Sequence, residues 1–408
     1  MGLHYGILIF GYALGFYMAW NIGANDVANS MASAVGAKAI TLRQAVFIAG
    51  ILNIVGAVFI GGHVTETIRQ GIVSSEVMSD PRAALLGALA ALLAAALWVS
   101  FATWKSLPVS TTHSIVGAMI GFGISAKGFS VIQWGKLGAV VASWVISPVF
   151  ALVLSYIMFK IIIKTVTSHK RPFLQALKLS PWFSGAILFV VVLSFLFKTP
   201  LGKTLNVAGP KAIAIAIVLA TILGFAVRAL LKKFLRHDER DGAEEIFRFI
   251  QVGSSCYVAL AGGANDVANA IGPLAVIYFL VTKGTIGAQV PVPVFLLLFG
   301  GVGIAAGISM AGYRVMDTLG HRITTLTNTR GFSVDFAAAT TVLVASNMGL
   351  PVSTTHAAVG GVLGVGLARG LEAVNYNIVF RIMLYWVLTV PAAAITSMAI
   401  FQLLDLFL

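Results

Sequence analysis

Long apolar segments alternate with short polar or basic connections along most of this 408-residue chain. Within each segment the apolar residues are continuous rather than alternating, which favours helices over the strands of a membrane barrel. With the shorter apolar stretches between them, these segments predict an all-α polytopic membrane protein of roughly 10–12 crossings. The segments long enough to cross a hydrocarbon core lie at 44–62, 83–104, 137–163, 182–197, 211–231, 292–312 and 382–404.

Composition and charge agree with this pattern. The chain is 59% hydrophobic and 10% charged, and so little charge could not cover the surface of a water-soluble protein of this length. The net charge is +13, and the Lys and Arg residues stand between the apolar segments, where they face anionic lipid and set topology. The basic balance therefore indicates a membrane and no nucleic acid. A single cysteine, Cys256, excludes an internal disulfide and a cysteine-based metal site.

Two polar motifs interrupt the apolar pattern, and each occurs twice in the same order. The sequence GANDVAN at 23–29 recurs at 263–269, and PVSTTH at 108–113 recurs at 351–356. The glycines that follow the second motif also recur, at 117 and 121 and at 360 and 364, and Gly-x-x-x-Gly pairs let helices approach closely.

This duplication divides the chain into a first repeat (1–165), a central transmembrane pair with a short cytoplasmic loop (166–244) and a second repeat (245–408). Two related halves that meet at a central site are typical of secondary transporters. The halves are inverted or parallel according to whether each crosses the membrane an odd or an even number of times, and the apolar pattern alone leaves this open.

The GANDVAN motif places an acid where the pattern is otherwise apolar. An aspartate inside a bilayer costs about 2.5–3.5 kcal/mol on insertion scales. Asp26 is accompanied by Asn25 and Asn29, and one helical face could present all three. We expect Gly23 to weaken the helix and free backbone carbonyls. Such oxygens suit a small hard cation, and hydrogen bonding between helices would not require the same seven residues twice.

The PVSTTH motif predicts a helix that begins inside the membrane. Pro108 ends the preceding segment, and Ser110 is a preferred N-cap residue. The free N–H groups of the first turn, the hydroxyl groups and the positive end of the helix dipole form a socket for an anion. One copy could be explained by capping alone, but two copies favour a tetrahedral oxyanion held between them. His113 and His356 end the motif and are candidates for either a structural hydrogen bond or a proton carrier.

None of the four motif copies contains Lys or Arg. If Asp26, Asp266 and a phosphate-like anion share one region, each like-charge contact costs roughly 4 kcal/mol at about 4 Å and an effective dielectric near 20. Helix dipoles offset only part of this cost, whereas bound cations would remove it. The sequence therefore predicts that cation and anion bind together, which is the property of a symporter.

These motifs resemble those of the inorganic phosphate transporter (PiT) family of sodium/phosphate symporters, whose mark is the doubled Gly-Ala-Asn-Asp-x-x-Asn signature. The resemblance covers nearly the whole chain. It implies about 12 transmembrane helices in two inverted repeats, with re-entrant or broken half-helices that meet at a central site, and a homodimer in the cell (cytoplasmic) membrane. It also implies that the protein is no enzyme and has no cofactor, and that its ligands are transported sodium ions and inorganic phosphate.

The family's site residues fall on both copies of each motif. The resemblance assigns phosphate binding to Asn25, Asp26, Ser110, Thr111, Thr112, Asn265, Asp266, Ser353, Thr354 and Thr355. It assigns sodium binding to Asn25, Asp26, Asn29, Asn265, Asp266 and Asn269.

Four alternatives stay open or are disfavoured. A proton could replace sodium, carried by His113 or His356, and sulfate could replace phosphate, although fully ionised sulfate cannot donate a hydrogen bond to Asp26 or Asp266. A passive anion channel would show flux without coupling. A membrane enzyme is disfavoured because the chain has no P-loop and no Ser-His-Asp order.

Overall fold

The structure is a computed structural model that describes residues 2–62, 80–198, 209–235, 242–284, 292–347 and 352–407. Within these residues the regular structure is helical and contains no strand. Pro351 and residues 238–241 of the charged segment 238–245 lie outside the described residues, and 242–245 form the start of a helix.

The apolar segments predicted from the sequence are all helices. In the described part of the chain, nine helices are long and apolar enough to cross a membrane. These nine are α1 (Gly2–Gly36), α2 (Leu42–Phe59), α5 (Pro81–Trp104), α7 (Trp134–Ile162), α8 (Pro172–Lys198), α10 (Pro210–Phe234), α11 (Gly242–Lys283), α12 (Val294–Ala311) and α16 (Tyr376–Phe407).

Shorter or more polar helices complete the fold. The α-helices among them are α6 (Thr111–Lys127), α13 (Tyr313–Asp317), α14 (Asn328–Asn347) and α15 (Thr354–Arg369). Single turns of 3-10 or π-helix occur at η1 (Phe129–Val131), η2 (Ile163–Thr167), η3 (Thr318–Arg322) and η4 (Leu371–Ala373). Helices α6 and α15 are the two that the PVSTTH motifs begin.

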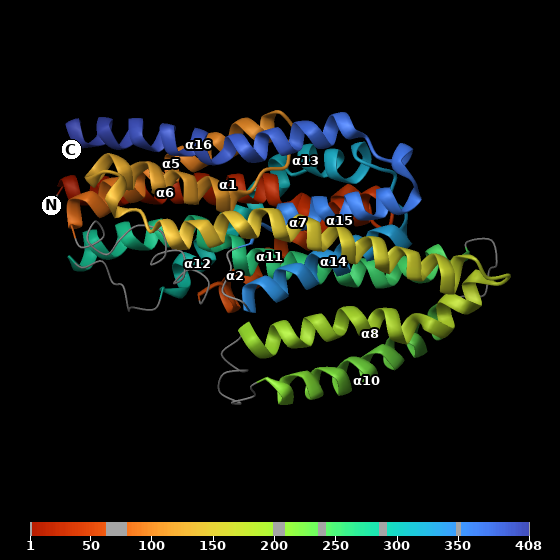
Figure 1. Cartoon of the computed structure of the whole chain (residues 1–408). Coiled ribbons are helices and arrows are strands. Elements are labelled where there is room, and N and C mark those ends of the chain that lie inside the picture. Colours follow the sequence, from red (N-terminus) through yellow and green to blue (C-terminus); the bar gives the residue numbers. More distant parts are fainter. Residues whose placement is uncertain are drawn as a thin grey trace.

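The two repeats are inverted. Helices α1 and α11 carry the two GANDVAN motifs and pack side by side, with Gly11 against Ile277 and Gly15 against Leu274, so they run in opposite directions. Figure 1 shows the hairpin of α5 and α6 in the half of the molecule that holds both chain ends, and the hairpin of α14 and α15 in the other half. Inverted repeats with half-helices are therefore confirmed.

The repeats are also intertwined. Helix α7 of the first repeat packs on α14 and α15 of the second, and α16 of the second repeat packs on α5 and α6 of the first. The recurring glycines make these contacts possible: Gly117 and Gly121 lie against the backbone of α16, and Gly360 and Gly364 lie against the backbone of α7. The predicted close packing at these glycines is confirmed.

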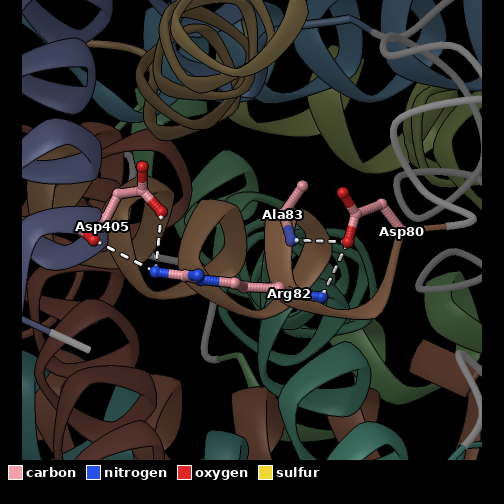
Figure 2. A network of polar contacts seen from close by, with 4 residues as sticks. All are labelled: Asp80, Arg82, Ala83 and Asp405. Carbon is pink, nitrogen blue, oxygen red and sulfur yellow. Dashed lines mark hydrogen bonds and ion pairs between the residues drawn. The ribbon is translucent and has the colours of Figure 1, made fainter.

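The hairpin of α5 and α6 is fastened to α16 at the start of α5. Asp80 is the N-cap of α5 and accepts hydrogen bonds from the backbone N–H groups of Arg82 and Ala83. The Arg82 side chain then forms an ion pair with Asp405 near the end of α16, at 3.1 Å (Figure 2). Both side chains of this pair are more than half exposed, so the pair contributes at most about 1 kcal/mol and chiefly fixes where α5 begins.

Helices α8 and α10 form the central pair, which has no counterpart in the repeats. They pack on each other and lie along the edge of the molecule in Figure 1, where α8 contacts α11 and α14. Most of α10 is exposed and apolar, as expected for a helix that faces lipid.

One sequence expectation is wrong. Gly23 does not weaken its helix, because α1 is continuous from Gly2 to Gly36 and α11 is likewise continuous through Gly263. A Cβ on Gly23 would collide with the carbonyl of Ile304 in α12, and one on Gly263 would collide with the backbone of Asn53 in α2. These glycines therefore permit close helix packing rather than freeing carbonyls for a ligand.

Candidate functional site

All four motif copies meet in the middle of the molecule. The GANDVAN residues lie near the centres of α1 and α11, and the PVSTTH motifs bring the first turns of α6 and α15 against them. Within the described part of the chain no group of three or more His, Cys, Asp or Glu side chains is placed to hold a metal ion. The polar groups are instead carboxylate, amide and hydroxyl groups, a donor set that suits a hard alkali cation rather than a transition metal.

Both half-helices begin where the sequence predicts. Ser110 is the N-cap of α6 and accepts from the N–H of His113 at 3.1 Å, and Ser353 is the N-cap of α15 and accepts from the N–H of His356 at 3.2 Å. The two serine hydroxyls are thus used for capping, and the remaining N–H groups of each first turn supply the positive end of a helix.

Each repeat holds the threonines of the other through one asparagine. Asn29 of α1 donates to the hydroxyls of Thr354 and Thr355, at 3.1 and 2.9 Å. Asn269 of α11 donates to those of Thr111 and Thr112, at 3.3 and 3.2 Å. The amide oxygens of both asparagines are buried and have no hydrogen-bond partner among the described residues. These two oxygens are therefore available to a cation.

The two aspartates, although equivalent in sequence, differ in their contacts. Asp26 accepts hydrogen bonds from Thr111 at 2.6 Å and Thr355 at 3.2 Å, in addition to one from Asn29 at 3.3 Å. Asp266 is equally buried, at 6% exposure against 8% for Asp26, but no described residue donates a hydrogen bond to it. A buried carboxylate without donors or a counter-charge is strongly unfavourable, so Asp266 is the acid of this site that most requires a counter-charge or a proton.

A cavity of about 30 Å³ borders the site and is lined by Asn29, Asn265, Thr354, Ser194 and Tyr257, among others. A volume of this size holds about two water molecules. The hydroxyls of Tyr257 and Ser194 are hydrogen-bonded to each other and join α11 to the central-pair helix α8.

Asn25 and Asn265 differ in the same way as the aspartates. Asn25 is fully buried and donates to Thr103 and to the carbonyl of Leu107, while its own oxygen accepts from the N–H of Val109 at 3.0 Å. Both polar atoms of Asn25 are therefore used to hold the loop before α6. Asn265 is only partly buried and lines the cavity.

The two histidines meet behind the threonines. The rings of His113 and His356 lie edge to face with their centroids 4.5 Å apart, and both side chains are almost completely buried. From the sequence, each histidine was a separate candidate, and no pattern indicated that the two would be in contact.

A third buried acid was missed by the sequence reading. Asp335 of α14 accepts hydrogen bonds from Ser33 at 2.6 Å, Ser254 at 2.8 Å and Ser255 at 2.6 Å, which belong to α1 and α11. One turn before these serines, Gln251 is fully buried, and both polar atoms of its amide have no partner among the described residues. An acid within a membrane helix is itself a signal, but the polar residues around Asp335 hid α14 from a search for apolar segments.

Comparison with known proteins gives a consistent result. The sequence profile of the phosphate transporter family matches residues 22–397, which include all four motif copies. A protein of Thermococcus kodakarensis named as a phosphate permease is 50% identical over 97% of this chain and 97% of its own. The chloroplastic inorganic phosphate transporter 2-1 of Arabidopsis thaliana is 40% identical over 96% of this chain and 70% of its own length.

A solved structure described as the sodium-dependent phosphate transporter has the same fold. It superimposes with a TM-score of 0.89, is 46% identical, and covers 99% of this chain and 100% of its own. At this level of identity both the fold and the arrangement of the repeats are shared.

Proposed function

Because this multi-pass membrane protein belongs to the phosphate transporter family, we propose that it is a secondary active transporter that carries inorganic phosphate together with Na⁺ across the cytoplasmic membrane. The similarity to a sodium-dependent phosphate transporter supports sodium as the coupling ion. We also propose, from the family resemblance, that the protein is a homodimer, which native mass spectrometry would test.

The contrast between the two aspartates is the observation that carries this proposal. Asp26 is satisfied by hydroxyl and amide donors, whereas no described residue donates to Asp266, and the amide oxygen of Asn269, one turn further along α11, has no partner there. Adding phosphate alone would place a further negative charge near two buried acids, at a cost of roughly 4 kcal/mol per close contact. Na⁺ between Asp266, the amide oxygen of Asn269 and the phosphate would remove that repulsion, so each ligand would strengthen the binding of the other.

We propose that phosphate binds between the first turns of α6 and α15. Thr112 and Thr354 are suited to contact it, because both are only partly buried and neither hydroxyl is held by a carboxylate. The free N–H groups of the two helix starts would supply further donors. Ser110, Ser353 and Asn25 would act indirectly, since their polar atoms already fix the helix starts and the loop before α6.

We propose a further cation position at Asp335. The carboxylate accepts from three serine hydroxyls of two other helices, the unpaired amide of Gln251 lies one turn before Ser254 on α11, and all of these groups are buried. Ser33 lies seven residues after Asp26 on α1, so the two acids are separated by about 10 Å along that helix. A cation bound at Asp335 would enter or leave the protein beside the main site and would not contact phosphate.

Uptake of labelled phosphate into proteoliposomes tests the proposal. An inward Na⁺ gradient should drive uptake above equilibrium at constant pH, and a pH gradient without Na⁺ should not. Full uptake driven by a pH gradient alone would show proton coupling instead. Phosphate flux that needs neither a Na⁺ gradient nor a pH gradient and survives Asp266→Asn would indicate a channel. Equal competition by sulfate would contradict the assignment of phosphate as the substrate.

A further inference from the structure

Four aromatic rings lie in contact in a row, called the stack below, across the boundary between the two repeats; the two outer contacts are tilted or face to face and the central one is edge to face. The order is Trp144, His113, His356 and Trp386, with centroid distances of 3.9 Å, 4.5 Å and 3.7 Å between successive rings. Trp144 and His113 belong to the first repeat, on α7 and α6, and His356 and Trp386 belong to the second, on α15 and α16. The contact between the two histidines therefore joins the half-helices directly.

Each tryptophan contacts the half-helix motif of both repeats. Trp144 stacks on His113 of α6, and its backbone carbonyl accepts a hydrogen bond from Nδ1 of His356 at 3.1 Å. Trp386 stacks on His356 of α15, and its indole N–H donates to the carbonyl of Pro108 at 3.2 Å, in the loop before α6. A displacement of α6 relative to α15 would disturb all of these contacts together.

Burial without a counter-charge favours neutral rings in the stack. A carbonyl can only accept, so Nδ1 of His356 carries a proton, and its Nε2 has no partner among the described residues. Neither ring nitrogen of His113 has a partner there. A chain that passes protons needs a hydrogen-bonded route on both sides of each ring, and the described residues give these rings none. The contacts that the described residues make with these rings are therefore chiefly to the ring faces and edges.

The stack opposes a repulsion that the site itself creates. The helix starts of α6 and α15 face the same central region, and each carries about half a positive charge. Before an anion binds, these two ends repel each other, and the Asp26 carboxylate, which accepts from Thr111 and Thr355, offsets only part of this repulsion. Because His113 directly follows Thr112, and His356 directly follows Thr355, the histidine contact fixes the spacing of the threonines that would hold phosphate.

We propose that Trp144, His113, His356 and Trp386 form a latch that holds the two half-helix starts at the spacing required for one phosphate ion. The histidines are then positioning residues and not proton carriers. This inference deepens the proposed function and relies on it for the effect on transport. It also predicts that the ring contacts hold the starts of α6 and α15 together in the protein without phosphate, and this can be measured separately from transport.

The first experiment measures amide hydrogen exchange in the full chain in lipid nanodiscs, without phosphate. His113→Ala should speed exchange in the first turn of α6 and also in that of α15, and His356→Ala should do the same in both. His113→Phe and His356→Phe keep an aromatic ring and should leave exchange near the wild-type rate. Faster exchange confined to the substituted helix, or no change in either, would overturn the latch whether or not the protein transports phosphate.

The second experiment measures Na⁺-driven phosphate uptake by the same variants. Each Ala variant should raise the KM for phosphate at least about fivefold, the lower end of coupling between sites, while the Phe variants stay close to wild type. The double Ala variant should be little worse than either single one, because one substitution already breaks the stack. Loss of uptake in the Phe variants as complete as in the Ala variants would show that the ring nitrogens, rather than the ring contacts, are required, and would overturn the latch. His169→Ala, at an exposed turn between α7 and α8, is the matched control and should change nothing.

Discussion

Replacing each of the two central aspartates by asparagine should separate their roles. Asp26→Asn removes a carboxylate that accepts from two threonines and an asparagine, the shortest bond being 2.6 Å. Hydrogen bonds to charged groups contribute about 1.5–3 kcal/mol each, and an amide can keep only part of this set. We expect Asp26→Asn to destabilise the ligand-free protein by about 2–4 kcal/mol.

Asp266→Asn should behave in the opposite way. Asp266 has no donor among the described residues, so its replacement by a neutral amide of the same shape removes an unfavourable buried acid. We expect the ligand-free protein to be as stable as wild type or more stable. The stabilisation that Na⁺ gives to the wild type, about 2.7 kcal/mol at a concentration of 100 Kd, should be lost.

Thermal unfolding in choline chloride and in sodium chloride measures both effects in the same samples. Asp317→Asn is the matched control, because Asp317 is half exposed and paired with Arg322, and this variant should keep the full response to Na⁺. If Asp266→Asn lowered the unfolding temperature in choline as much as Asp26→Asn does, the contrast between the two acids would be refuted. A full Na⁺ response in Asp266→Asn would show that the cation binds elsewhere.

Three other substitutions test single features of the fold and site. Asn25→Ala should destabilise the protein by about 2–4 kcal/mol in thermal unfolding, because it leaves the buried N–H of Val109 and its other partners unsatisfied; an unchanged unfolding temperature would contradict the loop-holding role. Gly23→Ala should reduce folded yield in size-exclusion chromatography, because α12 has no room for a methyl group there, whereas Gly135→Ala, where the space is open, should not. Asp335→Asn should raise the Na⁺ concentration needed for half-maximal uptake and have a smaller effect on the KM for phosphate at saturating Na⁺. An unchanged Na⁺ requirement would contradict a cation site at Asp335.

The architecture could be predicted from the sequence because its signals are local. Continuous apolar segments of sufficient length define seven of the membrane helices, and a serine or threonine after proline marks the start of α6. The repeated glycines indicated close helix contacts, which are present in both repeats. Gly23 was misread because the same absence of a side chain weakens an isolated helix and permits close packing, and only the neighbouring helix decides between them.

The pairings in the site could not be predicted because they depend on topology. Asn29 contacts Thr354 and Thr355, more than 300 residues away, because the repeats are intertwined. Asn25 and Asn29, one helical turn apart, were expected to share a role, but the loop before α6 engages the first and the start of α15 engages the second. Ser254 and Ser255 became significant only when the fold brought them to Asp335.

Equivalent residues of the two repeats make different contacts, and this has a consequence for how transport proceeds. The two motif copies have the same sequence, so the preference of the threonine hydroxyls for Asp26 over Asp266 comes from the conformation and not from the residues themselves. An exchanged arrangement, in which Thr354 and Thr112 bond Asp266 and leave Asp26 without donors, uses equivalent groups, and we expect it to be accessible. In an inverted repeat such an exchange would turn the open half of the site towards the other side of the membrane. On the proposed function, the aspartate without donors would hold the cation in each state, and the same threonines would link cation binding to the direction in which the site opens.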